Sequence, residues 1–236
     1  MDIVELNKIS PLRTFESGID GGLGKGNLGV IVSKHGVGKT ACLVHIATDK
    51  LMRKENVIHV SFSGNVEHVM SWYKEIFGGI SSRRALEDST EVFEDLLTNR
   101  VVMNFAQETM DIDKILGSLK SLIQQGAFKA DAVLFDGYKL TVASEEDVKK
   151  IKAFAQDLNI EVWFSVSPVR VDVEFDEYGI PNTIESYKDL IDVLVGLKYS
   201  DNKDRVILSV VKSHDRQDSE RMQVFLDPKS MLISTK

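Results

Sequence analysis

The sequence contains a single cysteine, Cys42, which excludes an intrachain disulfide and any metal site built from several cysteines. Cys42 falls inside a predicted helix between apolar neighbours, so we expect it to pack as a small hydrophobic residue. Only 4 residues are proline, and no low-complexity tract occurs, so the chain lacks the composition of a disordered protein. A globular protein with a substantial core is therefore expected.

Long hydrophobic runs are also missing from the sequence. No stretch approaches the ~18 apolar residues that a membrane span requires. The first residues lack the basic start and the apolar run of a signal peptide. We therefore expect a cytoplasmic protein that has no membrane partner.

Basic residues are outnumbered by acidic ones, with 29 Lys and Arg against 36 Asp and Glu and a formal net charge of -7. Such a surface repels the phosphate backbone of nucleic acids unless a local basic patch offsets the repulsion. The best basic cluster, Lys149, Lys150 and Lys152, lies close to Glu145 and Glu146 and has the pattern of a solvated helix face. Nucleic acid is therefore disfavoured as a partner, whereas nucleotides and proteins are favoured.

Short β-branched or apolar runs alternate with longer amphipathic segments, which is the pattern of parallel strands joined by crossover helices. The sequence predicts one α/β domain over residues 1–236, with a mostly parallel central sheet, helices on both faces and an antiparallel C-terminal edge. The expected strands are residues 28–33, 57–62, 101–105, 132–135, 160–166, 190–197, 206–211 and 222–226. The expected helices are residues 40–53, 66–77, 112–125 and 145–158, the last of them capped by Ser144.

Two stretches break this alternation. Residues 78–99 are expected to form a loop with an inserted helix, and residues 168–189 a long acidic loop with room for a hairpin. Long loops in compact domains often carry function, so both stretches are of interest.

The most informative segment is an apolar strand that runs into a glycine-containing loop and then into a helix. Glycines let backbone N–H groups converge on phosphate oxygens, and the start of the helix adds donors and positive partial charge. The residues expected to contact a nucleotide are Ser33, Lys34, His35, Gly36, Val37, Gly38, Lys39, Thr40 and Ala41. Lys39 would reach the β- and γ-phosphates, and the Thr40 hydroxyl would ligate Mg²⁺. Ser33 replaces the first glycine of the usual pattern.

A second acid-bearing strand supports this interpretation. Residues 132–136 form an apolar run that ends in Asp136. We expect the parallel sheet to place this carboxylate beside the neighbouring strand's phosphate loop, where it can hold the water shell of Mg²⁺ together with Thr40. A strand that ends in Asp before Gly137 is also a common turn. The prediction that Asp136 helps to bind Mg²⁺ therefore depends on the phosphate loop being present.

The segment from Gly21 to Phe62, which includes a glycine pair, a short turn and the phosphate-loop strand, resembles the opening of RecA-like ATPases of the KaiC, RadA and DnaB type, and is most similar to KaiC-like proteins. The resemblance implies a RecA-like three-layer fold, ATP and Mg²⁺ as cofactors, and assembly into rings or filaments with nucleotide between subunits. Only this first quarter of the chain is specific to the family.

The chain departs from the family where a catalytic glutamate is expected. In the family, this residue follows the strand after the phosphate-loop helix, but here Ser63 and Gly64 occupy that place. The loss of a positioned general base costs ~10²–10⁴ in rate. Glu67 or Glu108 could substitute, or each could be an ordinary solvated carboxylate.

A second departure concerns the Lys-x-Arg finger with which the family reaches the γ-phosphate of a neighbouring subunit. The corresponding segment matches in Lys212, but His214 replaces the arginine and so removes a permanent bidentate donor. The segment is either a working finger in trans, with Arg216 in support, or a solvated turn. Ser167 and Pro168 also stand where helicase-like members place a glutamine that senses the γ-phosphate.

These features favour an ATP-binding, KaiC-like protein that acts as a nucleotide-dependent assembly or signalling switch, with slow or no hydrolysis, and that assembles with itself or with a protein partner. Two alternatives remain. One is an active ring-forming ATPase that acts on nucleic acid, and the other is an autokinase of the KaiC kind.

Overall fold

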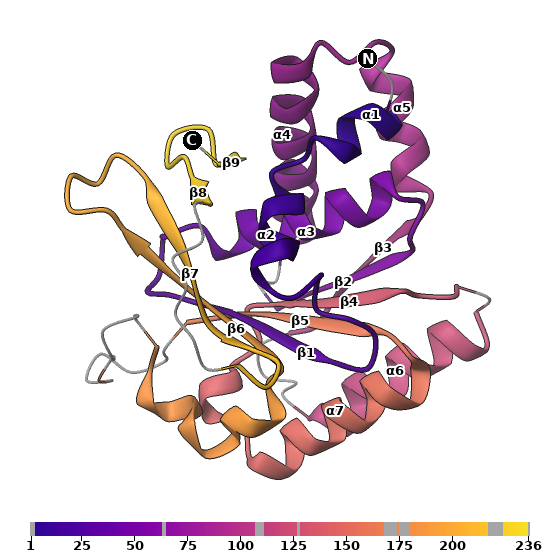
Figure 1. The fold of residues 1–236 in the computed structure, drawn as a ribbon. Helices are drawn as coiled ribbons and strands as arrows, with labels where there is room; N and C mark the ends of the chain where they lie inside the picture. The colour runs from indigo at the N-terminus through magenta and orange to yellow at the C-terminus, as the bar shows by residue number, and fades with distance from the viewer. Residues whose placement is uncertain are drawn as a thin grey trace.

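The computed structural model describes residues 3–62, 65–106, 111–126, 128–167, 174, 180–216 and 224–235. Within them, a nine-stranded sheet has the order β3-β2-β4-β5-β1-β6-β7-β8-β9 (Figure 1). The strands are β1 (Leu28–Val32), β2 (Val57–Ser61), β3 (Arg100–Asn104), β4 (Ala132–Asp136), β5 (Glu161–Val166), β6 (Val193–Tyr199), β7 (Val206–Ser213), β8 (Phe225–Leu226) and β9 (Ile233–Ser234). Pairing is parallel from β3 through β6 and antiparallel from β6 through β9.

Helices cover both faces of the sheet, so the fold has three layers (Figure 1). On one face lie α1 (Ile3–Lys8), α2 (Leu12–Gly18), α3 (Lys39–Met52), α4 (Val66–Arg84) and α5 (Ser89–Leu97). On the other lie α6 (Ile112–Gln124), α7 (Glu145–Leu158) and the 3₁₀ helices η1 (Leu140–Val142) and η2 (Asn182–Leu190). The mixed α/β architecture, the parallel body and the antiparallel edge confirm the coarse fold predicted from the sequence.

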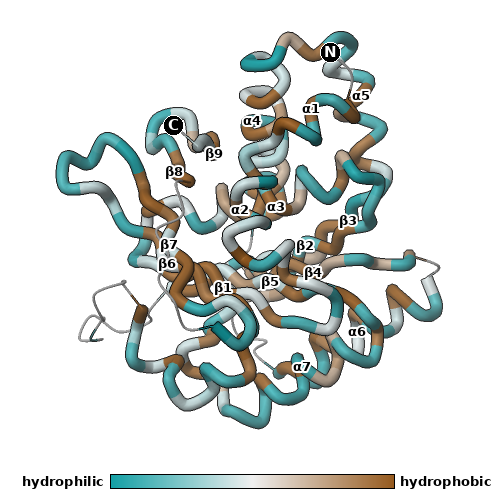
Figure 2. The backbone as a smooth tube through the Cα atoms, in the orientation of Figure 1, coloured by the Kyte–Doolittle hydropathy of each residue, from teal (hydrophilic) through white to brown (hydrophobic). Residues whose placement is uncertain are grey.

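Central strands that face helices on both sides read as continuous apolar runs. Every residue of β1, β2 and β4 is buried, and the sheet forms a hydrophobic band through the middle of the molecule (Figure 2). Alternate side chains enter different cores: Ile31 packs with α3 and α4, whereas Val30 and Val32 pack with α6 and α7. Cys42 is 1% exposed, as expected, and burial raises the pKa of its thiol to about 12.

The stretch predicted as a loop with an inserted helix is more regular than expected. Helix α4 continues past Phe77 to Arg84, and only residues 85–88 separate it from α5. The inserted helix is confirmed as α5, whereas much of the expected loop belongs to α4. A Cβ at Gly79 would lie 2.8 Å from Leu232 Cδ1, so this glycine permits close packing inside a continuous helix.

Helix α7 begins as predicted, with Ser144 as its cap. Residues 168–173 and 175–179 of the predicted long loop lie outside the described residues, and residues 182–189 belong to η2. Helices α1 and α2 were not predicted, since at 6 and 7 residues they are shorter than the window over which helical periodicity can be recognised. Among the described residues, no helix is long and apolar enough to cross a membrane.

Candidate functional site

The predicted phosphate loop connects the end of β1 to the start of α3, at the carboxyl edge of the parallel strands. Gly36 and Gly38 have φ angles of 76° and 112°, which only glycine adopts without strain. A Cβ at Gly38 would lie 2.3 Å from Leu226 Cδ2, so a side chain there is excluded by packing as well as by conformation. The glycines therefore allow the chain to turn tightly into α3 under a covering strand.

Lys39 begins α3, and its side chain folds back onto the loop. Its Nζ donates to the Ser33 carbonyl oxygen at 3.1 Å, to Ser33 Oγ at 3.1 Å and to the Lys34 carbonyl oxygen at 2.8 Å. The residue is 8% exposed, and burial lowers the pKa of its ammonium group to about 8, although Asp136 opposes this shift. Lys39 is thus a desolvated cation whose donors end on neutral oxygens.

Ser33, which replaces the usual glycine, contributes chemically to this arrangement. Its side chain is buried, and its hydroxyl donates to the Lys34 carbonyl oxygen at 2.9 Å while accepting from Lys39. Its backbone does not have a positive φ, so glycine is not required at this position. The sequence did not indicate this role of Ser33 as an acceptor.

Asp136 lies at the end of β4, but β4 is not the neighbour of β1 as the sequence suggested. Strand β5 lies between them. The two sites still meet because α3 packs across β5 and β4, which brings Thr40 Oγ1 to 3.0 Å from Asp136 Oδ1. Since the hydroxyl donates its proton to the carboxylate, its oxygen lone pairs stay available to a cation.

Polar groups from two other strands fix the Asp136 carboxylate. Ser165 Oγ donates to Asp136 Oδ1 at 2.5 Å and accepts from the Gly137 N–H at 3.0 Å. Nε2 of the buried His59 lies 3.9 Å from Asp136 Oδ2, and its Nδ1 lies 3.1 Å from the Tyr73 hydroxyl. Burial alone would raise the pKa of Asp136, but His59 and the hydroxyls outweigh it and hold the pKa below its usual range.

Lys39, Thr40, Asp136 and Ser165 line a cavity of about 640 Å³, a size suited to a nucleotide-sized ligand, whereas Ser33 and His59 are not among its lining residues. The cavity residues come from the loop, from the ends of β2, β4 and β5, from the start of α4, and from the C-terminal segment. They are His35, Gly36, Gly38, Lys39, Thr40, Ala41, Phe62, His68, Trp72, Asp136, Gly137, Tyr138, Lys139, Ser165, Ser167 and Met231. Of the remaining predicted nucleotide contacts, Val37 instead packs in the hydrophobic core.

A cation could be held here by Thr40 and Asp136. No group of three or more His, Cys, Asp or Glu side chains suited to a metal ion occurs among the described residues. A hard cation at this place would therefore take its other ligands from phosphate oxygens and water, as Mg²⁺ prefers to do.

Neither predicted substitute for a catalytic base is among the described residues that line the cavity. Glu67 is exposed in the first turn of α4 and does not line the cavity. Glu108 lies outside the described residues. The neighbouring His68 lines the cavity instead, which the sequence did not indicate.

The predicted finger residues lie away from this chain's own phosphate loop. Strand β7 runs antiparallel to β6, so Ser213 pairs with Val193 beside the beginning of β1, not its end. Lys212 Nζ donates to the Lys188 carbonyl oxygen at 2.9 Å, and His214 Nε2 donates to the Gly22 carbonyl oxygen at 3.1 Å. A role in trans for Lys212 and His214 stays a prediction.

Four residues of the site were not predicted from the sequence. His68, Trp72 and Ser165 line the cavity, and His59 lies beside Asp136. A hydroxyl near the end of β5 and a histidine inside the apolar run of β2 were the available signals, but their meaning depends on strand order. A scan of protein-family models and a search of curated proteins found no match to the chain. The function must therefore be inferred from the arrangement of Lys39, Thr40 and Asp136.

Proposed function

We propose that this chain binds Mg·ATP in the cavity above the phosphate loop, as a single-domain RecA-like protein of the KaiC type. Binding would drive assembly with further copies or with a protein partner, and hydrolysis would be slow or absent. The observation that carries this proposal is the convergence of Lys39, Thr40 and Asp136 at one end of the sheet. A carboxylate that is ionised, a hydroxyl bonded to it and a desolvated lysine are the groups that a magnesium-bound polyphosphate requires.

The loop residues would act in a defined way. Lys39 would exchange its three neutral oxygen acceptors for phosphate oxygens, which compensate its charge more fully. Backbone N–H groups around Gly38 and the first turn of α3 would bind the remaining oxygens. Mg²⁺ would neutralise phosphate charge, with Thr40 as a direct ligand and Asp136 orienting its water shell.

Slow turnover is supported by the side chains that line the cavity. Asp136 is the only carboxylate among its described lining residues, and it is engaged by Thr40 and Ser165. Its pKa is also held below the usual range, so it is a weak acceptor for a proton from an attacking water. Without a positioned base, hydrolysis loses a contribution of ~10²–10⁴ in rate.

The RecA-like assignment is supported by the alternation of parallel strands and crossover helices and by the antiparallel edge that follows it. The proposed assembly rests on the resemblance of the sequence to ring- and filament-forming ATPases.

The binding claim is tested by thermal unfolding with and without Mg·ATP. At ~100 times its dissociation constant, the ligand should stabilise the fold by ~2.7 kcal/mol and raise Tm. Lys39→Ala should lose this shift. Lys120→Ala, which removes an exposed lysine of α6 on the opposite face of the sheet, should keep it. A wild-type chain without a shift in Tm would refute nucleotide binding.

Phosphate release across protein concentrations tests the rest of the proposal. No turnover above the Lys39→Ala control supports a binding switch. Turnover that rises with concentration would instead mean that subunits complete each other's sites. Stimulation by single-stranded DNA would favour the nucleic-acid motor, and a phosphoryl group gained in intact-mass measurement would favour the autokinase.

A further inference from the structure

His68 lines the proposed nucleotide cavity from the beginning of α4. It is exposed, and the same cavity is lined by Lys39, Thr40 and Asp136. Its neighbour on the next helical turn, Trp72, lines the cavity as well. Neither residue is explained by phosphate-loop chemistry.

The hydrogen bond between these two residues fixes the chemistry of the imidazole. Trp72 Nε1 lies 3.1 Å from His68 Nε2, and the two rings meet edge to face at 75°. An indole N–H can only donate, so His68 Nε2 must be an unprotonated acceptor. The proton of the neutral ring is then on Nδ1, for which no partner occurs among the described residues. His68 therefore presents one N–H donor and no free lone pair.

A histidine in this state can bind an anionic oxygen through its Nδ1–H, whereas its lone pair accepts from Trp72 and is not directed at a water in the cavity. It is suited to recognising a phosphoryl group and unsuited to general-base catalysis. This property agrees with the slow hydrolysis proposed above.

The position of α4 identifies the phosphate involved. Strand β2 lies beside β4, with Ser61 in register with Asp136, and the Phe62 N–H donates to the Asp136 carbonyl oxygen at 3.0 Å. The chain reaches the N-cap of α4, Asn65, three residues later. Helix α4 thus begins on the Asp136 side of the cavity. In magnesium-bound nucleotides the cation bridges β- and γ-oxygens, so this side is where the terminal phosphoryl group of ATP would lie.

We propose that His68 distinguishes ATP from ADP by donating its Nδ1–H to an oxygen of the terminal phosphoryl group, with Trp72 as the positioning residue that fixes the tautomer. This inference rests on the proposed nucleotide site and assigns its selectivity. Since α4 is 19 residues long and runs from the cavity to Arg84, contact with the terminal phosphoryl group would be made by the first turn of a long helix.

The test compares ADP with an ATP analogue that has a nitrogen between the β- and γ-phosphates. Calorimetry in the presence of Mg²⁺ gives a dissociation constant for each, and the ratio of the two constants measures the preference. Removal of a hydrogen bond to a charged oxygen in His68→Ala should weaken the analogue about tenfold or more. ADP affinity should be unchanged. Because the asparagine amide nitrogen lies near the place of ring Nδ1, His68→Asn should retain the preference, whereas His68→Gln should lose it.

Trp72→Phe keeps an aromatic ring but removes the indole donor, so it should reduce the preference without abolishing binding of ADP. Glu75→Gln, an exposed change on the same helix outside the cavity, is the matched control and should leave the ratio unaltered. Melting temperatures of all variants verify that they are folded.

The outcomes separate the two proposals. If the wild-type chain binds neither nucleotide, the proposed function fails, and this inference fails with it. If the wild type binds both but His68→Ala leaves the ratio unchanged or weakens both nucleotides equally, only the role of His68 is overturned. Selective loss of the analogue, with rescue by His68→Asn, supports it.

Discussion

The side chain of Lys39 is desolvated without a charged hydrogen-bond partner. It is buried, yet its hydrogen bonds reach only carbonyl and hydroxyl oxygens of Ser33 and Lys34. Neutral acceptors satisfy its donors without compensating its charge, which explains why burial lowers its pKa to about 8. A polyphosphate would supply the missing charge.

Nucleotide binding should therefore be coupled to protonation of Lys39. Bound phosphate raises the pKa of the ammonium group above its value of about 8 in the free chain. Affinity should be constant below that pKa and fall as pH rises above it, because the free lysine must then be protonated to bind. Calorimetry just above pH 8, in two buffers with different ionisation enthalpies, measures the expected proton uptake.

Lys39→Arg is the control for this prediction, since arginine stays protonated throughout this range. If this variant still binds the nucleotide, binding should take up no proton. Equal apparent enthalpies for the wild-type chain in the two buffers would contradict the prediction.

At the site, the sequence predicted the loop, Lys39, Thr40 and Asp136, because strand, glycine and helix signals follow one another in the chain. It could not predict Ser165 and His59, since these come from β5 and β2 and their proximity depends on the strand order. For the same reason, Asp136 was wrongly placed on the strand next to the loop.

Helix α7 starts with a reciprocal pair of hydrogen bonds. The Asp147 N–H donates to Ser144 Oγ at 3.1 Å, and the Ser144 N–H donates to Asp147 Oδ2 at 3.2 Å. Each bond satisfies a backbone donor that has no partner within the helix. These contacts depend on residues three apart, which is why this helix start was predicted correctly.

Replacement of this cap should have a moderate effect. Ser144→Ala removes an N-cap acceptor and should lower the free energy of unfolding by ~1 kcal/mol. Ser118→Ala is the matched control: its hydroxyl donates to the Lys114 carbonyl oxygen within α6, a bond that contributes little to helix stability. Urea unfolding of both variants measures the difference. Equal stabilities would show that the capping bonds are replaced by water without cost.

The elements that were mispredicted are those decided by distant partners. Gly79 lies inside α4, where the absence of a side chain lets Leu232, far away in the sequence, pack against the helix. Helices α1 and α2 have little sequence periodicity and are ordered by their contacts with α3. By contrast, the buried strands are short runs of mainly apolar residues bounded by polar segments, and they were located to within a few residues.

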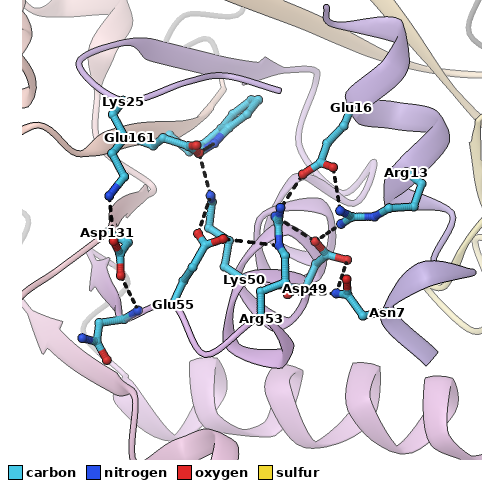
Figure 3. Close-up of polar contacts among 12 residues, drawn as sticks. Asn7, Arg13, Glu16, Lys25, Asp49, Lys50, Arg53, Glu55, Asp131 and Glu161 are labelled. Carbon is cyan, nitrogen blue, oxygen red and sulfur yellow. Dashed lines mark hydrogen bonds and ion pairs between the residues drawn. The ribbon is translucent and has the colours of Figure 1, made fainter. Parts of the chain in front are cut away.

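Across the molecule, an ion-pair network fastens the N-terminal helices to the C-terminal end of α3 (Figure 3). Asp49, 2% exposed at its side chain, pairs with Arg13 and with Arg53 Nη2 at 2.9 Å, and it accepts from Asn7 Nδ2 at 3.3 Å. The network borders a second cavity of about 310 Å³ at the edge of the sheet opposite the phosphate loop. Helix α3, 14 residues long, therefore joins the loop at one end to this network at the other.

Asp49→Asn should destabilise the whole chain. The substitution keeps the volume of the side chain but leaves Arg13 and Arg53 without their most buried partner, and we expect a loss of about 2 kcal/mol in the free energy of unfolding. Asp95→Asn is the control, because Asp95 and its partner Lys54 are 59% and 65% exposed. Such surface pairs contribute ~0–1 kcal/mol. Urea unfolding measures the free energy of unfolding of the two variants. Similar losses of stability in both would contradict a structural role for the network.

The loop around Gly38 is covered by residues that lie far away in the sequence. Leu226 packs directly on this glycine, Met231 borders the cavity, and the Ile233 N–H donates to His45 Nε2 on α3 at 3.2 Å. During synthesis the loop emerges from the ribosome long before these residues do. A nascent chain thus carries the whole Gly38 loop without the residues that cover it, and the pocket is complete only after residue 233 has been translated.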